Sequence, residues 1–180
     1  MRFGVEAQAA PPAGRELLDC TGLAARRTLA ELRGVRGEML LVRAPDVTLS
    51  RPVRVLHPRL PVYVVPRGEG LYMIGATMIE SDSGQRISAR SMLELLSAAY
   101  ALHPAFGEAE ILDSGVGVRP AFPDNLPRIR RVGGALYVNG LYRHGFLLAP
   151  ALARRAALAL LEGQNFAEVM DENPRQRRLA

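Results

Sequence analysis

Lysine is absent from the 180-residue sequence, so all 23 of its basic residues are arginine. This absence excludes enzymes that form a Schiff base through lysine and nucleotide-binding proteins of the P-loop type, because both need the lysine amine. The single cysteine, Cys20, excludes an internal disulfide. The three histidines, His57, His103 and His144, are scattered without the spacing of metal ligands. We therefore expect no metal site.

Long apolar runs are also absent. No run approaches the roughly 20 residues that span a bilayer, and the start, MRFGVEAQAAPPAG, lacks the apolar region of a signal peptide. We expect a soluble, cytoplasmic protein that does not contact a membrane. The 17 glycines nowhere form GxGxxG, which excludes dinucleotide binding by the usual first βαβ turn.

A net charge of +5 raises the possibility of nucleic-acid binding. The basic residues, however, are spread among 18 acidic ones, and the tightest cluster, RQRR, lies at 175–178 in a polar segment that we expect to be a mobile tail. The charge pattern therefore does not favour a nucleic-acid partner.

The middle of the sequence predicts a β-sheet. Apolar alternation and β-branched residues mark strands at 37–44, 51–57, 61–67 and 71–77, and RGEG at 67–70 is typical of a hairpin turn. Further strands are predicted outside this section, at 3–7, 16–20, 108–120 and 135–140. The strand at 16–20 is expected to be buried, residues 23–34 to form a helix or a turn, and the proline-rich segment 119–128 to form a loop.

Two helices are predicted. Ser88 can cap a helix that begins at residue 89, has one apolar face and ends before Pro104. A last helix runs from Phe146 or Ala149 to Leu161, with Pro150 in its first turn, where a missing N–H is tolerated.

The stretch NGLYRHGFLLAP at 139–150 places Gly140 and Gly145 at the start of the last helix. Unpaired N–H groups and the helix dipole can seat an anionic or electron-rich group there. The alternative is a loop that simply enters a helix, and spacing alone favours that alternative.

Five ordered stretches carry a more specific signal. Together they resemble the C-terminal half of FAD-dependent amino-acid oxidases, the D-amino-acid oxidase family, and within it the glycine oxidases of thiamine biosynthesis. The similarity runs from near Met1 to about Phe166, through LLDCTGLAAR, RGVRGEMLLV, VYVVPRGEGLYMIGATMIESD, GVRPAFPDNLP and NGLYRHGFLLAP.

The resemblance implies an α/β fold that is α+β-like over the residues present. A substrate domain with an antiparallel or mixed sheet joins the C-terminal part of a doubly wound FAD-binding domain, which lacks its N-terminal dinucleotide-binding βαβ unit. The implied segments are the FAD-domain remnant 1–33, the substrate domain 34–115, the return to the FAD domain 116–167 and the tail 168–180. We expect a C-terminal half whose apolar surface favours a homo-oligomer or a separate N-terminal half.

The resemblance also implies roles for individual residues. The substrate-binding residues are Arg119, which grips the carboxylate through two parallel bonds, with Tyr63, Arg143 and Met78. From the residues alone, a salt-bridged arginine and a core methionine are the favoured interpretations, and a half-buried strand tyrosine is a common one. The implied cofactor-binding residues are Thr21, Gly22, Gly140, Leu141, Tyr142, Arg143, His144, Gly145, Phe146 and Leu147.

The implied activity is oxidation of a small amino acid or amine by hydride transfer to FAD, with oxygen as acceptor and peroxide as by-product. No general base or nucleophile is assigned, because the chemistry belongs to the cofactor. Without the glycine-rich turn, we expect FAD to bind this chain alone weakly or not at all. The alternative is a non-catalytic remnant or subunit that binds a small carboxylate or another protein.

Overall fold

The computed structural model describes residues 16–57 and 61–170. The chain forms two compact units, one of which consists of two separate segments of the sequence. In the described residues, unit 1 consists of 16–33 with 120–170, and unit 2 consists of 34–119. The predicted strand 3–7 and residues 171–180 of the predicted tail lie outside the described residues.

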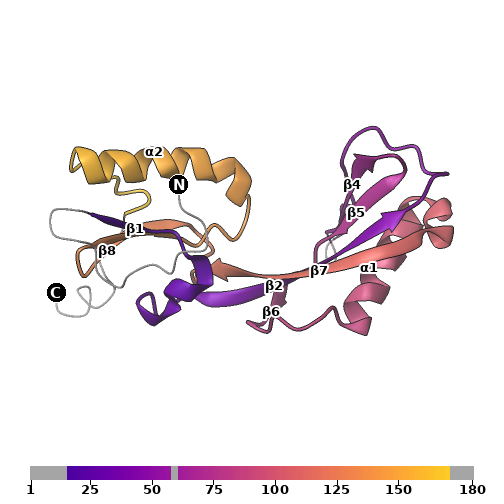
Figure 1. The fold of residues 1–180 in the computed structure, drawn as a ribbon, viewed down its shortest axis with the longest axis horizontal. Coiled ribbons are helices and arrows are strands. Elements are labelled where there is room, and N and C mark those ends of the chain that lie inside the picture. The colour runs from indigo at the N-terminus through magenta and orange to yellow at the C-terminus, as the bar shows by residue number, and fades with distance from the viewer. Residues whose placement is uncertain (1–15, 58–60, 171–180) are drawn as a thin grey trace. The chain divides into compact units, whose positions relative to one another are not determined.

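Unit 2 is built on a six-stranded sheet (Figure 1). The order β3-β4-β5-β2-β6 is antiparallel throughout, and β7 pairs with β2. The bounds are β2 Arg33–Arg43, β3 Val53–Arg54, β4 Tyr63–Gly68, β5 Leu71–Gly75, β6 Ile79–Glu80 and β7 Glu110–Ala121. All four strands predicted in the middle section are present, although the second, β3, has only two residues.

The hairpin between β4 and β5 has the predicted turn. Gly68 pairs with Leu71, which leaves a two-residue loop of Glu69 and Gly70. Both residues have positive φ, 51° and 70°, as a type I′ turn requires. The pairing then shifts register between Pro66 and Gly68, and this shift places Tyr63 opposite Gly75.

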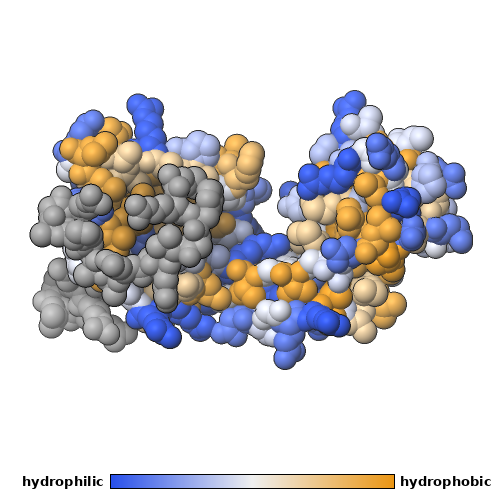
Figure 2. All heavy atoms as spheres, viewed as in Figure 1, coloured by the Kyte–Doolittle hydropathy of each residue, from blue (hydrophilic) through white to orange (hydrophobic). Residues whose placement is uncertain are grey.

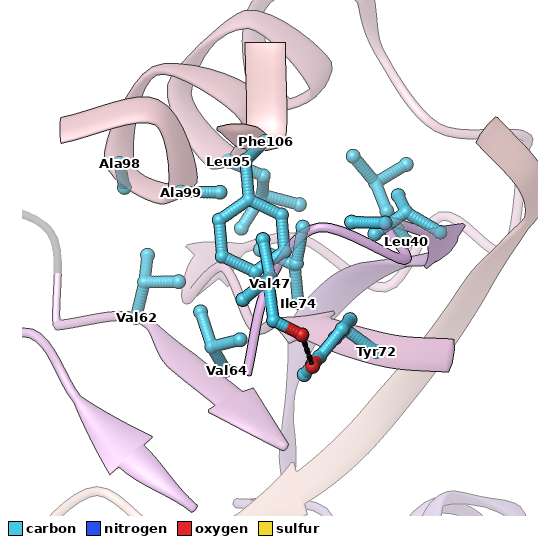
Figure 3. Packing of buried hydrophobic residues seen from close by; sticks show 12 residues of the cluster. Leu40, Val47, Val62, Val64, Tyr72, Ile74, Leu95, Ala98, Ala99 and Phe106 are labelled. Atoms are coloured by element: carbon cyan, nitrogen blue, oxygen red, sulfur yellow. Dashed lines mark hydrogen bonds between the residues drawn. The ribbon is translucent and has the colours of Figure 1, made fainter. Parts of the chain in front are cut away.

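One face of this sheet is covered by α1, Ala89–Leu102. Ser88 caps the helix as predicted, because its side chain accepts a hydrogen bond from the Ser91 N–H. Figure 3 shows the packing of helix and strand side chains around Phe106 of η2, Pro104–Glu108, and the hydrogen bond that the Tyr72 hydroxyl donates to the Val47 carbonyl. The core cluster comprises Leu40, Val42, Ala44, Val47, Val62, Val64, Tyr72, Ile74, Leu95, Ala98, Ala99 and Phe106.

Unit 1 contains a three-stranded sheet in the order β1-β9-β8. β1 runs parallel to β9, and β9 pairs antiparallel with β8. Helix α2 packs against this sheet through Leu152, Ala156 and Ala159, which join Ile129 and Leu136 in one buried cluster. The bounds are β1 Leu17–Asp19, η1 Gly22–Arg27, β8 Arg128–Val132, β9 Ala135–Asn139 and α2 Gly145–Leu161.

The predicted fold class is confirmed, but three local expectations are wrong. Strand β8 was not foreseen, and β1 is not buried, since Leu18 is 43% exposed in a strand with one neighbour among the described residues. Pro150 lies beyond the first turn, because α2 begins at Gly145. The carbonyl that loses its helical donor belongs to Phe146, a fully exposed residue, so water can bond it.

The start of the predicted tail at 168–170 has defined contacts. Met170 forms a bridge with Ile129, and Glu168 pairs with Arg155 at 2.8 Å. Val169 and Met170 pack against the cluster beneath α2. Residues 168–170 therefore extend the sheet-and-helix packing of unit 1.

Candidate functional site

The first candidate group lies on the face of the unit 2 sheet opposite α1. The core residues of β2 and β5 include Leu40, Val42 and Ile74, and side chains alternate between the two faces of a strand. Gly37 and Met39 therefore point to the other face. Apolar side chains, in orange, lie exposed along β2 and β7 in Figure 2.

Arg119 reaches this open face from β7. A Cβ added at Gly37 would overlap with the Arg119 guanidinium, so the guanidinium lies directly over the Gly37 backbone. Its Nη1 donates a hydrogen bond to the Thr77 carbonyl at 3.2 Å. Within residues 16–57 and 61–170, no carboxylate pairs with this half-buried cation.

Arg36, which also lies in the unit 2 sheet, on β2, differs from Arg119 in its surroundings. It faces the core side and forms an ion pair with Glu38, whose side chain is fully buried. Burial would raise the pKa of Glu38, but a hydrogen bond from Ser91 and the contacts with Arg36 outweigh it. The net effect, to which the Ser88 N–H also contributes, is a lowered pKa. The charge of Arg36 is therefore satisfied within the fold, whereas that of Arg119 has no acidic partner among the described residues.

Tyr63 shares the open face with Arg119. It pairs with Gly75, which in turn pairs with Met39, and directly paired residues project to the same side. Its ring is 42% exposed, and the Arg54 guanidinium lies 5.5 Å from the ring centroid. The structure thus brings two of the predicted substrate-binding residues to one sheet face.

Met78 is placed elsewhere. It lines a cavity of about 220 Å³ between the segment after β5 and helix α1, together with Thr77, Arg90 and Glu94. Arg119 is not among the residues that line this cavity. Thr77 is the residue that connects the two regions, since its carbonyl bonds Arg119.

In unit 1, the two predicted cofactor-binding segments lie together. β1 and β9 are parallel, so Thr21 and Gly22 after β1 and Gly140 after β9 lie at the same edge of the sheet. The buried Asn139 joins them: its Nδ2 donates to the Gly22 carbonyl and its Oδ1 accepts from the Gly140 N–H, both at 2.8 Å. Thr21 donates to the Asp19 carboxylate from both its N–H and its hydroxyl.

The segment 140–147 turns sharply into α2. Gly140 has φ +79°, and His144 is the N-cap residue in the left-handed region, without a side-chain cap bond. In the first turn of α2, Phe146 and Leu147 are 100% and 75% exposed. These positions fit a helix start whose N–H groups and apolar side chains are available to a ligand.

Tyr142 and Arg143 differ in exposure within this segment. The buried Tyr142 ring has the Arg33 and Arg143 guanidinium groups at 5.9 and 5.3 Å from its centroid. Leu141 packs against the cluster beneath α2, whereas Arg143 is exposed. The packing of Tyr142 and Leu141 therefore anchors the loop.

Phe122 packs against the backbone turn at Gly140. It is fully buried, and a Cβ added at Gly140 would lie 2.8 Å from its Cε2, so only glycine fits there. Arg130 lies over the same ring, 5.1 Å from its centroid, and pairs with Glu31 at 2.6 Å. The sequence analysis assigned no role to Arg130. In the structure, Arg130 packs on the Phe122 ring, which in turn contacts the turn at Gly140.

Comparison with known proteins identifies the family. The family described as FAD dependent oxidoreductase matches residues 2–159. The chain belongs to that family. No helix in the described part of this family member has the length and apolar character needed to cross a membrane.

Individual relatives are consistent with the family. ThiO of Rhizobium etli, by name a thiamine biosynthesis oxidoreductase, is 63% identical over 148 residues, 82% of this chain and 45% of that protein. The glycine oxidase of Geobacillus kaustophilus is 36% identical over 121 residues, 64% of this chain and 31% of that protein. Its crystal structure superposes with a TM-score of 0.71 over 84% of this chain and 42% of that chain, at 30% identity. The chain therefore spans less than half the length of these relatives.

Proposed function

We propose that this chain supplies the substrate-binding sheet and part of the flavin site of an FAD-dependent oxidase of glycine or another small amino acid. Unit 2 serves as the substrate domain, and unit 1 belongs to the FAD-binding domain. Relatives named glycine oxidase and ThiO support this assignment, and a role in thiamine biosynthesis accompanies it.

The observation that carries the proposal is the Arg119 guanidinium. It is a half-buried cation on an open sheet face, without an acidic partner in the described residues. A planar guanidinium holds a carboxylate through two parallel charge-assisted bonds. With Nη1 bonded to Thr77, the Nε and Nη2 edge is the one that receives the substrate carboxylate. Tyr63, on the same face, orients it.

The residues of unit 1 fit a flavin. The carboxyl ends of two parallel strands, joined by Asn139, lead into a helix start with a glycine that approaches closely. Thr21, Gly22 and the segment 140–147 would hold the cofactor, with their N–H groups toward its electron-rich edge. When bound, flavin supplies the electron acceptor for amine oxidation.

No acid or base is required of the side chains. Cys20, beside Thr21, is not suited to nucleophilic chemistry, because partial burial and the Asp19 carboxylate raise the pKa of its thiol. The contribution of this chain is orientation and electrostatic stabilisation, which together can provide much of a rate enhancement.

The test joins this chain to the portion of the Rhizobium etli relative that precedes the matched region. We expect the fusion to bind flavin and to release peroxide with glycine but not with methylamine. Arg119→Ala should raise KM for glycine about ten- to hundredfold with little change in kcat, since it removes charge-assisted bonds formed in both the ground and transition states. Arg43→Ala is the control, because Arg43 is exposed and lies at the other end of β2.

Three outcomes oppose the proposal. Equal losses for substrates with and without a carboxylate, at unchanged flavin content, would leave Arg119 as a structural residue. A fusion that binds flavin but oxidises no amino acid would contradict the activity. A fusion that binds acetate but no flavin would support the non-catalytic alternative instead.

A further inference from the structure

Arg119 reaches its position by crossing a neighbouring strand. Arg43 pairs with Glu110 at one end of the β2–β7 contact, and Gly34 faces Val118 toward the other, so the two strands are antiparallel. Because β5 occupies the opposite edge of β2, the Arg119 side chain must pass over β2 to reach Thr77. It does so at Gly37, the one residue type without a side chain to block it.

We propose that Gly37 and Thr77 are positioning residues that fix the Arg119 guanidinium for a substrate carboxylate. The inference rests on the proposed role of Arg119 and deepens it. Gly37 provides the space over β2, and the Thr77 carbonyl holds one end of the guanidinium at 3.2 Å. A planar group held at one end and supported from below presents its remaining N–H groups in a fixed direction, which reduces the ordering cost of binding.

Thr77 is itself held by the sheet. Its N–H donates to the Glu38 carbonyl at 3.1 Å, and its Oγ1 accepts from the Glu38 N–H at 2.9 Å. The residue is 4% exposed. This reciprocal pair fixes the peptide that bonds Arg119, so removal of the hydroxyl should loosen the guanidinium without touching it.

The experiment uses the 180-residue chain itself, with acetate as probe. Nitrogen-detected NMR of arginine side chains reports both the Kd for acetate and the rotation of the Arg119 guanidinium in the absence of any ligand. We expect Gly37→Ala to weaken acetate binding on the order of tenfold or more and to release the guanidinium rotation, because the added methyl occupies its place. Thr77→Val should release the rotation and weaken binding severalfold, whereas Thr77→Ser should restore both.

Gly117→Ala is the matched control. Gly117 lies on β7 on the same face as Arg119, and a Cβ there meets nothing within 4 Å. We expect its acetate affinity and guanidinium rotation to equal those of the unsubstituted chain. In an Arg119→Ala background, Gly37→Ala should have no further effect on acetate, since the two changes act through one group.

The outcomes separate the inference from the proposed function. If Arg119→Ala leaves the acetate affinity unchanged, the carboxylate anchor is wrong. If Arg119→Ala weakens binding but Gly37→Ala and Thr77→Val do not, the positioning role is wrong. Free rotation of the guanidinium in the unsubstituted chain also overturns it. Should Gly37→Ala fail to fold by circular dichroism, the Thr77→Val and Thr77→Ser pair decides the question.

Discussion

Glu38 is a fully buried carboxylate, and its substitution by glutamine gives a sharp test of the unit 2 core. The change keeps the shape of the side chain and removes its charge. Arg36 is only 8% exposed and would then remain buried without a counter-ion, held by the Ser83 and Arg86 carbonyls. An uncompensated buried charge is far more costly than a lost hydrogen bond.

The expected cost follows from this burial. Breaking a buried ion pair by removing one partner destabilises a protein by about 3–5 kcal/mol. For a unit of this size, each 1 kcal/mol lowers Tm by about 4–8 °C. Glu110→Gln is the matched control, because the Arg43–Glu110 pair is 3.5 Å long and its side chains are 53% and 64% exposed. That control should cost less than about 1 kcal/mol.

The pH dependence has a definite sign. The folded state lowers the pKa of Glu38, so its stabilising contribution is present above the unfolded value of about 4.3 and is lost as pH falls through the folded pKa. The difference between the unsubstituted chain and Glu38→Gln should therefore shrink in acid. Urea unfolding followed by circular dichroism at several pH values measures it. A loss below about 1 kcal/mol at neutral pH, or one that grows in acid, would refute the reasoning.

Two predictions concern the loop of unit 1. Gly140→Ala should destabilise the chain by several kcal/mol and weaken flavin binding by the fusion with the Rhizobium etli portion, because the methyl meets Phe122 at a φ of +79°. Gly133→Ala, with φ +56° and open space, should cost only about 1–2 kcal/mol of backbone strain. Chemical denaturation and flavin fluorescence distinguish them, and equal costs would contradict the packing argument. Arg130→Ala should cost about 2–4 kcal/mol, because it removes one of the two guanidinium groups that lie over Phe122 and takes from Glu31 its ion-pair partner. A loss below about 1 kcal/mol, as expected for an exposed pair, would show that the packing on Phe122 is unimportant.

Local sequence patterns predicted much of the fold. Alternation over 37–44, 61–67 and 71–77 predicted the central strands, and RGEG predicted a hairpin whose two loop residues have positive φ. Ser88 predicted the start of α1. These features depend on neighbours in sequence, on side-chain period and on turn conformation, so the sequence contains the information directly. The charged strand β8, Arg128–Val132, was missed because its pattern is not apolar and pairing with β9 alone defines it.

Tertiary structure decided which residues act together. The resemblance indicated Arg119 and Gly140, but nothing in their local sequence points to Gly37, Thr77, Asn139 or Phe122, the residues that hold them in place. Gly37 must be glycine only because the side chain of Arg119, which is far away in the sequence, crosses over it. Arg36 and Arg119 are both arginines on strands of the same sheet. Arg36 forms an ion pair with Glu38 in the core, whereas Arg119 has no carboxylate partner among the described residues. The difference arises because strand pairing sets the face on which each side chain lies, and no single segment encodes that pairing.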